Sequence, residues 1–419
     1  MNRRPALLAA AVLAALPLPA AAQSLDQVMQ DALANSPALE AAQARADAAD
    51  ATLEQARAEG MPSASLQGQV GIGRIDPQGF FTLAADDVTP RVAQVEAEWP
   101  LLTFGRVGSA IEQARAGQDL AAVNIGATAL HLRLQVVESY SKARAARELV
   151  SSNTALSTSR NEVLRQAQLK FEAGEGTRTE IAQAQARLAG AEAALAQANG
   201  DLAAAEAQLA MLAGYPVDAS RALPSPPAVP ATREEALALA MEANPTLRQA
   251  RHVVRMADAA IRAARAETLP AIAAYAEASS VRDQFFPGYK ADSASLGVRG
   301  RWRFYSGGRA SAATDRAQAE ARAAEADVRV AEQLVRVRTV QAFEAVQAAR
   351  LALAATQAQA SATLEALRAT RLEVEVGEKP QIALLDAERE ASMAETARIR
   401  AEGDLLVASY TLRNLTGME

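Results

Sequence analysis

The sequence predicts a mainly helical protein that also forms a transmembrane β-barrel, with the barrel continued by long coiled helices. Three observations support this fold class. The chain repeats one unit of roughly two hundred residues, a period too long for an ordinary solenoid. Each unit passes from helix to strand and back to helix. An export signal stands at the N-terminus, so the strands can reach an outer membrane.

The repeat is visible in matched motifs. The segment ARAEGMP at 56–62 recurs as ARAETLP at 264–270, an offset of 208 residues. From Trp99 and Trp302 onward the offset is 203, so one short segment absorbs the difference, as surface loops do. The first repeat is expected at 23–216 and the second at 232–419. The proline-rich segment 217–231 is interpreted as the linker.

Residues 1–22 are predicted to be a signal peptide. Arg3 and Arg4 precede an apolar run at Ala6–Leu16, and three alanines lead to a mature start at Gln23. The apolar run is too short for a membrane anchor, although an uncleaved signal stays an alternative. The chain has no cysteine, so neither a lipid anchor nor a disulfide scaffold is expected.

Composition narrows the function classes. The net charge of −6, which becomes −8 without the signal peptide, argues against nucleic acid as a partner. The only histidines are His131 and His252, in different repeats, and no cysteine could join them as a ligand or nucleophile. We therefore expect no enzyme activity, metal or cofactor. No stretch after the signal is expected to reach the length of a transmembrane helix. A soluble periplasmic protein and an outer-membrane barrel remain.

Each repeat is expected to open with two helices. The first repeat has a short helix from Ser24 to Asn35 and a second from Pro37 to about residue 59, because proline fits the first helical turn. The second repeat copies them at 232–243 and 245–267. Thr232 and Glu235 have the spacing of a capping box.

The period then changes to two residues, which predicts β-hairpins at about 62–104 and about 270–305. One strand face is small and apolar, and the other is charged. Segments of this length and pattern are typical of transmembrane strands. The charged residues expected to face a lumen are Glu96, Glu98, Glu277, Arg299, Arg301 and Arg303.

Aromatic residues flank both ends of these hairpins, as in the girdle of a membrane barrel. One end carries Trp99, Phe104, Trp302 and Phe304, and the other Phe80, Phe81, Phe285 and Phe286. The alternative is a pair of amphipathic hairpins on a soluble domain.

A helix of more than sixty residues is predicted from Arg106, followed by a break at 174–176 and a second helix to about residue 212. The second helix has an apolar seam with alternating spacings of three and four, a coiled-coil pattern. The seam is Ile181, Ala184, Leu188, Ala191, Leu195, Ala198, Leu202, Ala205, Leu209 and Leu212. The second repeat keeps this seam except at Arg398, whose charge is expected to turn to water.

Four strands cannot close a barrel. In lipid an unpaired strand edge costs several kcal/mol per backbone group. The chain must therefore borrow strands from copies of itself. Three copies would supply twelve strands, but the pattern alone does not fix that number.

The order of these elements resembles the TolC family of outer-membrane channel proteins, and the similarity covers the whole mature chain. The motifs that carry it are ANSP at 34–37, EANP at 242–245, FGR at 104–106, SGGR at 306–309, AGEGTRTEIAQAQARL at 173–188 and VGEKPQIALLDAERE at 376–390. The resemblance implies a homotrimer with a 12-stranded outer-membrane β-barrel in lipid and a periplasmic 12-helix tunnel. It also implies two partners, a periplasmic adaptor and an inner-membrane pump or ABC transporter of type I secretion.

The expected function is therefore an exit channel of an efflux or secretion system, located in the outer membrane with a long periplasmic extension. The alternative is an exported periplasmic coiled-coil scaffold that never enters lipid. The sequence names no cargo.

Two sites follow from this resemblance and from the helix breaks. The periplasmic aperture is expected at Glu180, Lys379 and Asp386. The adaptor-docking turns are expected at Gly174, Glu175, Thr177, Gly377 and Glu378. The chain departs from the family pattern at Ala383, where an aspartate is usual, and at Pro380, where a threonine is usual.

Overall fold

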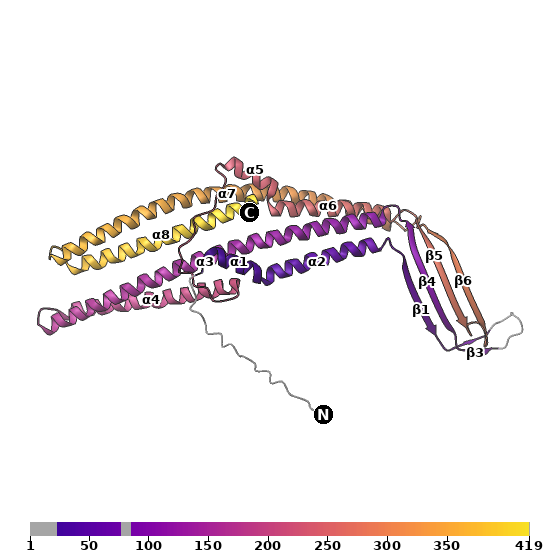
Figure 1. Cartoon of the computed structure of the whole chain (residues 1–419), viewed down its shortest axis with the longest axis horizontal. Helices are drawn as coiled ribbons and strands as arrows, with labels where there is room; N and C mark the ends of the chain where they lie inside the picture. The colour runs from indigo at the N-terminus through magenta and orange to yellow at the C-terminus, as the bar shows by residue number, and fades with distance from the viewer. Residues whose placement is uncertain (1–22, 77–84, 419) are drawn as a thin grey trace, which may run out of the picture. The chain divides into compact units, whose positions relative to one another are not determined.

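The structure is a computed structural model, and it describes residues 23–76 and 85–418 (Figure 1). The predicted signal peptide therefore lies outside the described residues. The chain forms two compact units. One contains the segment up to Pro37 together with Ala129–Ala238 and Arg338–Glu419, and the other contains Ala38–Thr128 and Leu239–Val337. Each unit draws on both repeats.

The helices occur in repeat-related pairs of equal length. The short pair has 11 residues each, the next 22, the long pair 67 and the last 36. In chain order the helices are α1 (Leu25–Asn35), α2 (Pro37–Ala58), α3 (Arg106–Glu172), α4 (Arg178–Ala213), α5 (Arg233–Ala243), α6 (Pro245–Ala266), α7 (Arg309–Glu375) and α8 (Gln381–Thr416). At about 1.5 Å per residue, α3 and α7 each extend for roughly 100 Å.

Local capping explains several helix starts. The Ser24 hydroxyl accepts a hydrogen bond from the Gln27 N–H at the start of α1. The Glu235 N–H donates to the Thr232 hydroxyl, as the capping box predicts. The Glu235 carboxylate accepts from the Ala231 N–H, one residue before the expected position.

The expectation of no apolar stretch long enough for a membrane was wrong in one place. Helix α3 contains an 18-residue window with a mean hydropathy of 1.3, of which the chain itself buries only 28%. Alanine, valine and leucine raise the hydropathy there. A core helix of a water-soluble region passes the same test, so this window alone is weak support for a membrane span.

The main sheet has four strands in the order β1-β4-β5-β6, and every neighbouring pair is antiparallel. Its strands are β1 (Ser63–Val70), β4 (Arg91–Leu102), β5 (Ala271–Arg282) and β6 (Lys290–Arg301). The central pair, β4 and β5, joins the first repeat to the second. In the described part of the chain, the outer edges of β1 and β6 have no strand partner.

The strands differ from the expected hairpins in detail. The first strand ends at Val70, and a short second ladder follows, in which β2 (Gly73–Ile75) pairs with β3 (Asp86–Val88). Strand β6 ends at Arg301, so Trp302 and Phe304 lie beyond the ladder. Phe80 and Phe81 lie outside the described residues.

The core of the first unit gathers α1, α3, α4 and α8. Val28, Val136, Leu209 and Leu406 are all nearly or fully buried in it. The proline-rich segment begins in this core, since Val217 and Ala219 belong to the same cluster. The segment is thus packed at its start and is not a free tether.

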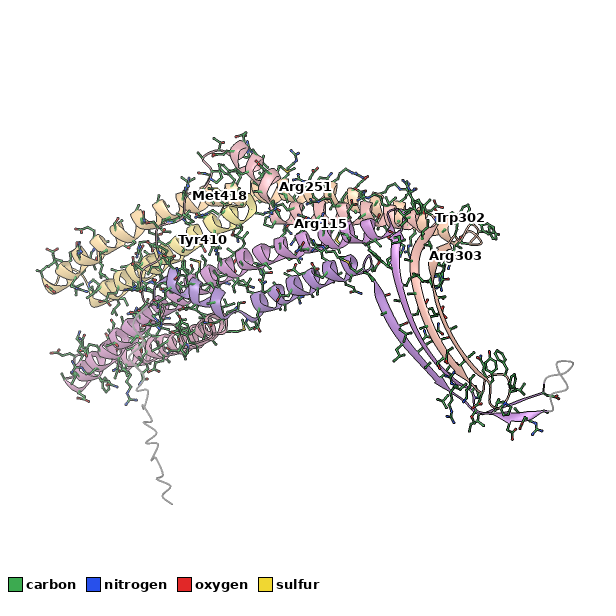
Figure 2. The ribbon with its side chains drawn as sticks, turned by 45° about the vertical axis from the view of Figure 1, so that its right-hand side comes forward. Arg115, Arg251, Trp302, Arg303, Tyr410 and Met418 are labelled. Atoms are coloured by element: carbon green, nitrogen blue, oxygen red, sulfur yellow. The ribbon has the colours of Figure 1, made fainter. Side chains whose placement is uncertain are left out.

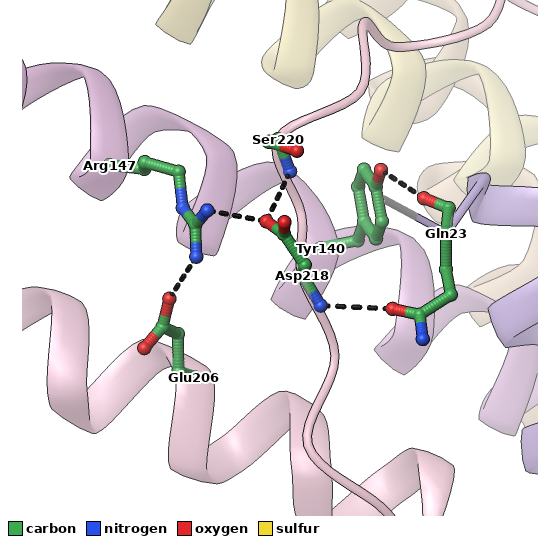
Figure 3. A network of polar contacts seen from close by, with 6 residues as sticks. All are labelled: Gln23, Tyr140, Arg147, Glu206, Asp218 and Ser220. Carbon is green, nitrogen blue, oxygen red and sulfur yellow. Dashed lines mark hydrogen bonds and ion pairs between the residues drawn. The ribbon is translucent and has the colours of Figure 1, made fainter. Parts of the chain in front are cut away.

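A polar network fixes the same region (Figure 3). The Tyr140 hydroxyl donates to the Gln23 carbonyl oxygen at 2.8 Å, and the Asp218 N–H donates to the Gln23 side-chain oxygen at 2.9 Å. Arg147 forms ion pairs with Asp218 and with Glu206. The first residue of the expected mature chain is therefore held against α3 and the segment after α4.

Helix α8 packs against α3 in an antiparallel contact. The Ser159 hydroxyl donates to Glu388 at 3.1 Å, and the Asn414 amide donates to the Leu130 carbonyl oxygen at 2.9 Å. Between these points a Cβ atom on Gly403 would lie 3.0 Å from the Cβ of Ser141. Glycine at this position thus allows the two helices to approach closely.

The apolar seam of α4 is confirmed. Ala184, Ala191, Ala198 and Leu209 are buried, and the remaining seam positions are at least half-buried. In α8 the interruption at Arg398 is compensated differently from the expectation. Arg398 forms ion pairs with Glu395 and Glu402, so two carboxylates neutralise its charge within the helix.

Candidate transport surface

Four of the charged strand residues share one face of the sheet with Arg301. Directly opposed residues of an antiparallel ladder point to the same side. Glu96 opposes Glu277, and Glu98 opposes Tyr275. Tyr275 opposes Gly297, two residues from Arg299 and four from Arg301, which also point to this side. We call this side the charged face.

Arg303 is different from the other charged residues. It follows the last residue of β6, so the strand alternation does not fix its direction. Figure 2 shows Arg303 beside Trp302, between β6 and the start of α7. The ladder stops two residues before Arg303, so its place on the strand face stays a prediction.

Contacts on the charged face cross three strands. The Arg299 guanidinium lies 3.1 Å from the Glu96 carboxylate and 4.0 Å from that of Glu98. The same guanidinium lies 4.6 Å from the centre of the Tyr275 ring. The Gln94 amide donates to Glu277 at 3.1 Å. Acidic and basic side chains thus compensate each other along the sheet surface.

The opposite side of the sheet is apolar and open. Leu66 is 75% exposed, Leu296 83% and Val298 66%, although the other side of the sheet is polar. Such exposed apolar area on one face is typical of a surface that another apolar phase covers. We call this side the apolar face.

The apolar face has a polar boundary at the β5–β6 turn. Arg282 and Asp292 form an ion pair of 2.8 Å there, and Arg91 lies directly opposite Arg282. Between Arg91 at this boundary and Trp99, strand β4 extends for about 26 Å at about 3.3 Å per residue. That length matches the apolar band of an outer-membrane strand.

Aromatic rings mark both ends of the sheet, as expected. At the β5–β6 turn, the rings of Phe285 and Phe286 lie 5.0 Å and 5.3 Å from that of Tyr289. At the other end, Trp302 and Phe304 form an edge-to-face pair with 6.2 Å between ring centres. Aromatic rings at these levels fit the two interfaces of a bilayer.

The turn between α3 and α4 is tightly determined. Gly174 has φ of +79°, a backbone conformation that favours glycine. Thr177 and Glu180 form a complete capping box, in which the Glu180 carboxylate accepts from the Thr177 N–H at 2.8 Å. Gly176 was not proposed as a site residue, yet a Cβ there would lie 2.9 Å from the Phe171 nitrogen.

The turn between α7 and α8 has the same backbone but different contacts. Gly377 has φ of +81°. Pro380 occupies the N-cap position of α8 and provides no side-chain cap. Instead, Lys379 forms an ion pair of 2.7 Å with Glu373, near the end of α7. Among the described residues, Glu373 is therefore the carboxylate that pairs with Lys379.

Asp386 lies exposed on α8, about one and a half helical turns after the helix begins at Gln381. Its neighbourhood contains a residue that the sequence did not single out. Arg160 on α3 is 8% exposed and donates to the Leu385 carbonyl oxygen at 3.4 Å. Burial, followed by Arg187, lowers the pKa of Arg160, while Asp386 and Glu388 raise it.

Comparison with known proteins agrees with this geometry. The family model described as outer membrane efflux protein matches residues 28–215 and 236–418, which is most of the chain. Among curated proteins, the outer membrane efflux protein BepC of Brucella suis biovar 1 (strain 1330) is 27% identical over 285 residues. That alignment spans 68% of this chain and 62% of BepC.

Solved structures share the fold over nearly the whole chain. The CmeC outer-membrane channel of Campylobacter jejuni superposes with a TM-score of 0.82 at 15% identity, covering 100% of this chain and 93% of CmeC. The outer-membrane channel OprN gives 0.78 at 23% identity, covering 94% and 90%. The open-state MtrE channel of Neisseria gonorrhoeae gives 0.75 at 23% identity, covering 94% and 89%.

These matches confirm the predicted TolC-like fold and favour the outer-membrane channel over the scaffold alternative. They also agree with the expectation of a transport protein without enzyme activity, since the matched family and neighbours are outer-membrane efflux channels. The chain belongs to the outer membrane efflux protein family and has the fold of the TolC-like channels of the outer membrane.

Proposed function

We propose that this chain is the outer-membrane exit channel of a tripartite export system. It acts as a passive conduit, a periplasmic adaptor opens it, and an inner-membrane pump or ABC transporter supplies the energy. One observation carries this proposal. A single four-stranded sheet has an exposed apolar face, a charged face and two edges that lack a strand partner among the described residues, and it leads directly into helices of 67 residues.

The functional form is a homotrimer. Each chain supplies four strands, and the free edges of β1 and β6 run antiparallel to each other because the sheet alternates direction at every step. The edge of β6 can therefore pair with β1 of a second copy. Three such pairings give a closed barrel of twelve strands, which leaves no edge in lipid.

The charged face lines the lumen and the apolar face contacts lipid. In a membrane barrel, inward and outward residues alternate along each strand. Glu96, Glu98, Glu277, Arg299 and Arg301 then form the charged wall of the conduit. Their mutual ion pairs lower the net charge that a passing molecule meets.

The two helical turns are the adaptor-docking sites. Gly174, Glu175 and Thr177 are exposed at the first turn, and Gly377 and Glu378 at the second. Both turns present a glycine with positive φ, followed by an acidic side chain. Exposed backbone of this kind permits close approach by the helix tips of another protein.

The periplasmic aperture comprises Glu180, Lys379 and Asp386. Asp386 is exposed, and in a trimer three copies would face one axis. Like charges in a narrow passage attract cations. Opening of this region would involve the Lys379–Glu373 ion pair and the Glu180 cap, because these contacts fix the two turns.

Charge reversal at the turns tests adaptor docking. The double variant Glu175→Arg and Glu378→Arg keeps both glycines and their positive φ, but it inverts the charge that meets the adaptor. We expect loss of adaptor recovery after cross-linking in cells, with trimer formation and membrane insertion intact. Glu192→Arg, an exposed reversal within α4, serves as the control. Undiminished adaptor recovery by the double variant would contradict the docking assignment.

Removal of the aperture carboxylate tests its role in ion passage. Asp386→Ala should weaken block by divalent cations and lower cation selectivity in single-channel recordings. Thermal stability should change little because the side chain is exposed. Glu390→Ala, another exposed position of α8, is the matched control. If Asp386→Ala retains wild-type block and selectivity, the constriction lies elsewhere.

The ion pairs of the charged face give a third prediction. Arg299→Ala leaves the Glu96 and Glu98 carboxylates without their cation. The barrel should become more cation-selective, which shifts the reversal potential measured across a salt gradient. Arg299→Lys keeps the positive charge and should shift it less. A shift toward anion selectivity, or none, would place Arg299 outside the lumen.

A further inference from the structure

Tyr275 and Gly297 form an unusual pair at the centre of the charged face. They oppose each other directly across β5 and β6, so both point to the same side. A Cβ atom on Gly297 would lie 3.0 Å from Cε1 of Tyr275, 3.1 Å from its hydroxyl oxygen and 3.2 Å from Cζ. The tyrosine ring therefore lies over the glycine, in the space that any side chain at position 297 would fill. We call this space the cradle.

Arg299 holds the ring from the neighbouring position. Its guanidinium lies 4.6 Å from the ring centre and reaches on to Glu96 and Glu98 on β4. The residue opposite Arg299 is Ala273, whose small side chain lets the arginine cross β5 at the level of the sheet. The long side chains of Tyr275 and Arg299 thus both lie along the charged face of the sheet.

We propose that Gly297 is a positioning residue that keeps the Tyr275 ring flat against the barrel wall and so sets the width of the lumen at this level. This inference rests on the proposed channel and on the charged face as its lining. The threefold symmetry of the trimer multiplies the effect on the width of the lumen. Three copies around one axis place their Tyr275 side chains at the same height, so three displaced rings would narrow one section of the conduit.

The alternative for Tyr275 is to stand away from the sheet. A β-branched residue at 297 would occupy the cradle, and because the clash is with the ring and hydroxyl, the ring must move. In this proposal the ring turns away from the wall, toward the lumen axis. Gly297→Val should therefore reduce conductance although it adds only a small side chain itself.

Conductance of single trimers in planar bilayers tests this inference with three variants. Gly297→Val should show a loss of conductance relative to wild type. The double variant Tyr275→Ala with Gly297→Val should recover it, because the displaced ring is then absent. Gly300→Val is the matched control, since it lies on the apolar face of the same strand with open space around its Cβ position. It should conduct as wild type.

The outcomes separate this inference from the channel proposal. A wild-type protein that inserts but never conducts, even with its adaptor present, would overturn the proposed function itself. A conducting wild type with an unchanged Gly297→Val variant would overturn only the cradle. Equal loss in the single and double variants would also overturn it, because valine alone would then explain the narrowing. Trimer content on a native gel shows that each variant assembles before it is recorded.

Discussion

The free edges of the four-stranded sheet are the constraint on which this structure depends. Every backbone N–H and C=O group within a bilayer needs a partner, and the outer edges of β1 and β6 find none in the described part of the chain. Four strands are too few to close on themselves. The apolar face cannot enter lipid until copies of the chain pair these edges, so insertion into the membrane requires assembly.

The helices show the same dependence in water. Helix α8 buries one seam against its hairpin partner and a second set of residues, including Ile399 and Leu406, on another side. The repeat-related positions of α4 are Ala196 and Ala203, and both are exposed. These positions are thus buried in α8, and the related positions are exposed in α4. In a ring of chains, a neighbouring copy can cover the exposed positions of α4.

The sequence was sufficient for much of the architecture, for identifiable reasons. Proline at N1 of α2 and α6 and glycine at positive φ in the turns are local signals, and both located helix ends closely. The period of two located the hairpins. The β2–β3 ladder was missed because it is short and carries no alternation. The alternation of the sequence continues past Arg301, the last residue of β6, so the strand does not place Arg303 on either face.

Other features depend on contacts between distant segments, which a pattern cannot show. The Tyr275 cradle needs Gly297 opposite, and register alone decides that pairing. Arg160 is one of many helical arginines in the sequence, and only the packing of α3 on α8 distinguishes it. Arg398 appeared as a defect in a seam, yet Glu395 and Glu402 lie at helical spacing to neutralise it.

The central claim is that the strand edges close only between copies of this chain. Native mass measurement of the detergent-extracted protein tests it most directly, because it counts chains in the particle that has left the membrane. The account predicts a particle of three chains, with no stable species of one chain under conditions that keep the strands folded. A folded, monodisperse single chain in detergent would contradict it, since four strands would then persist with both edges open.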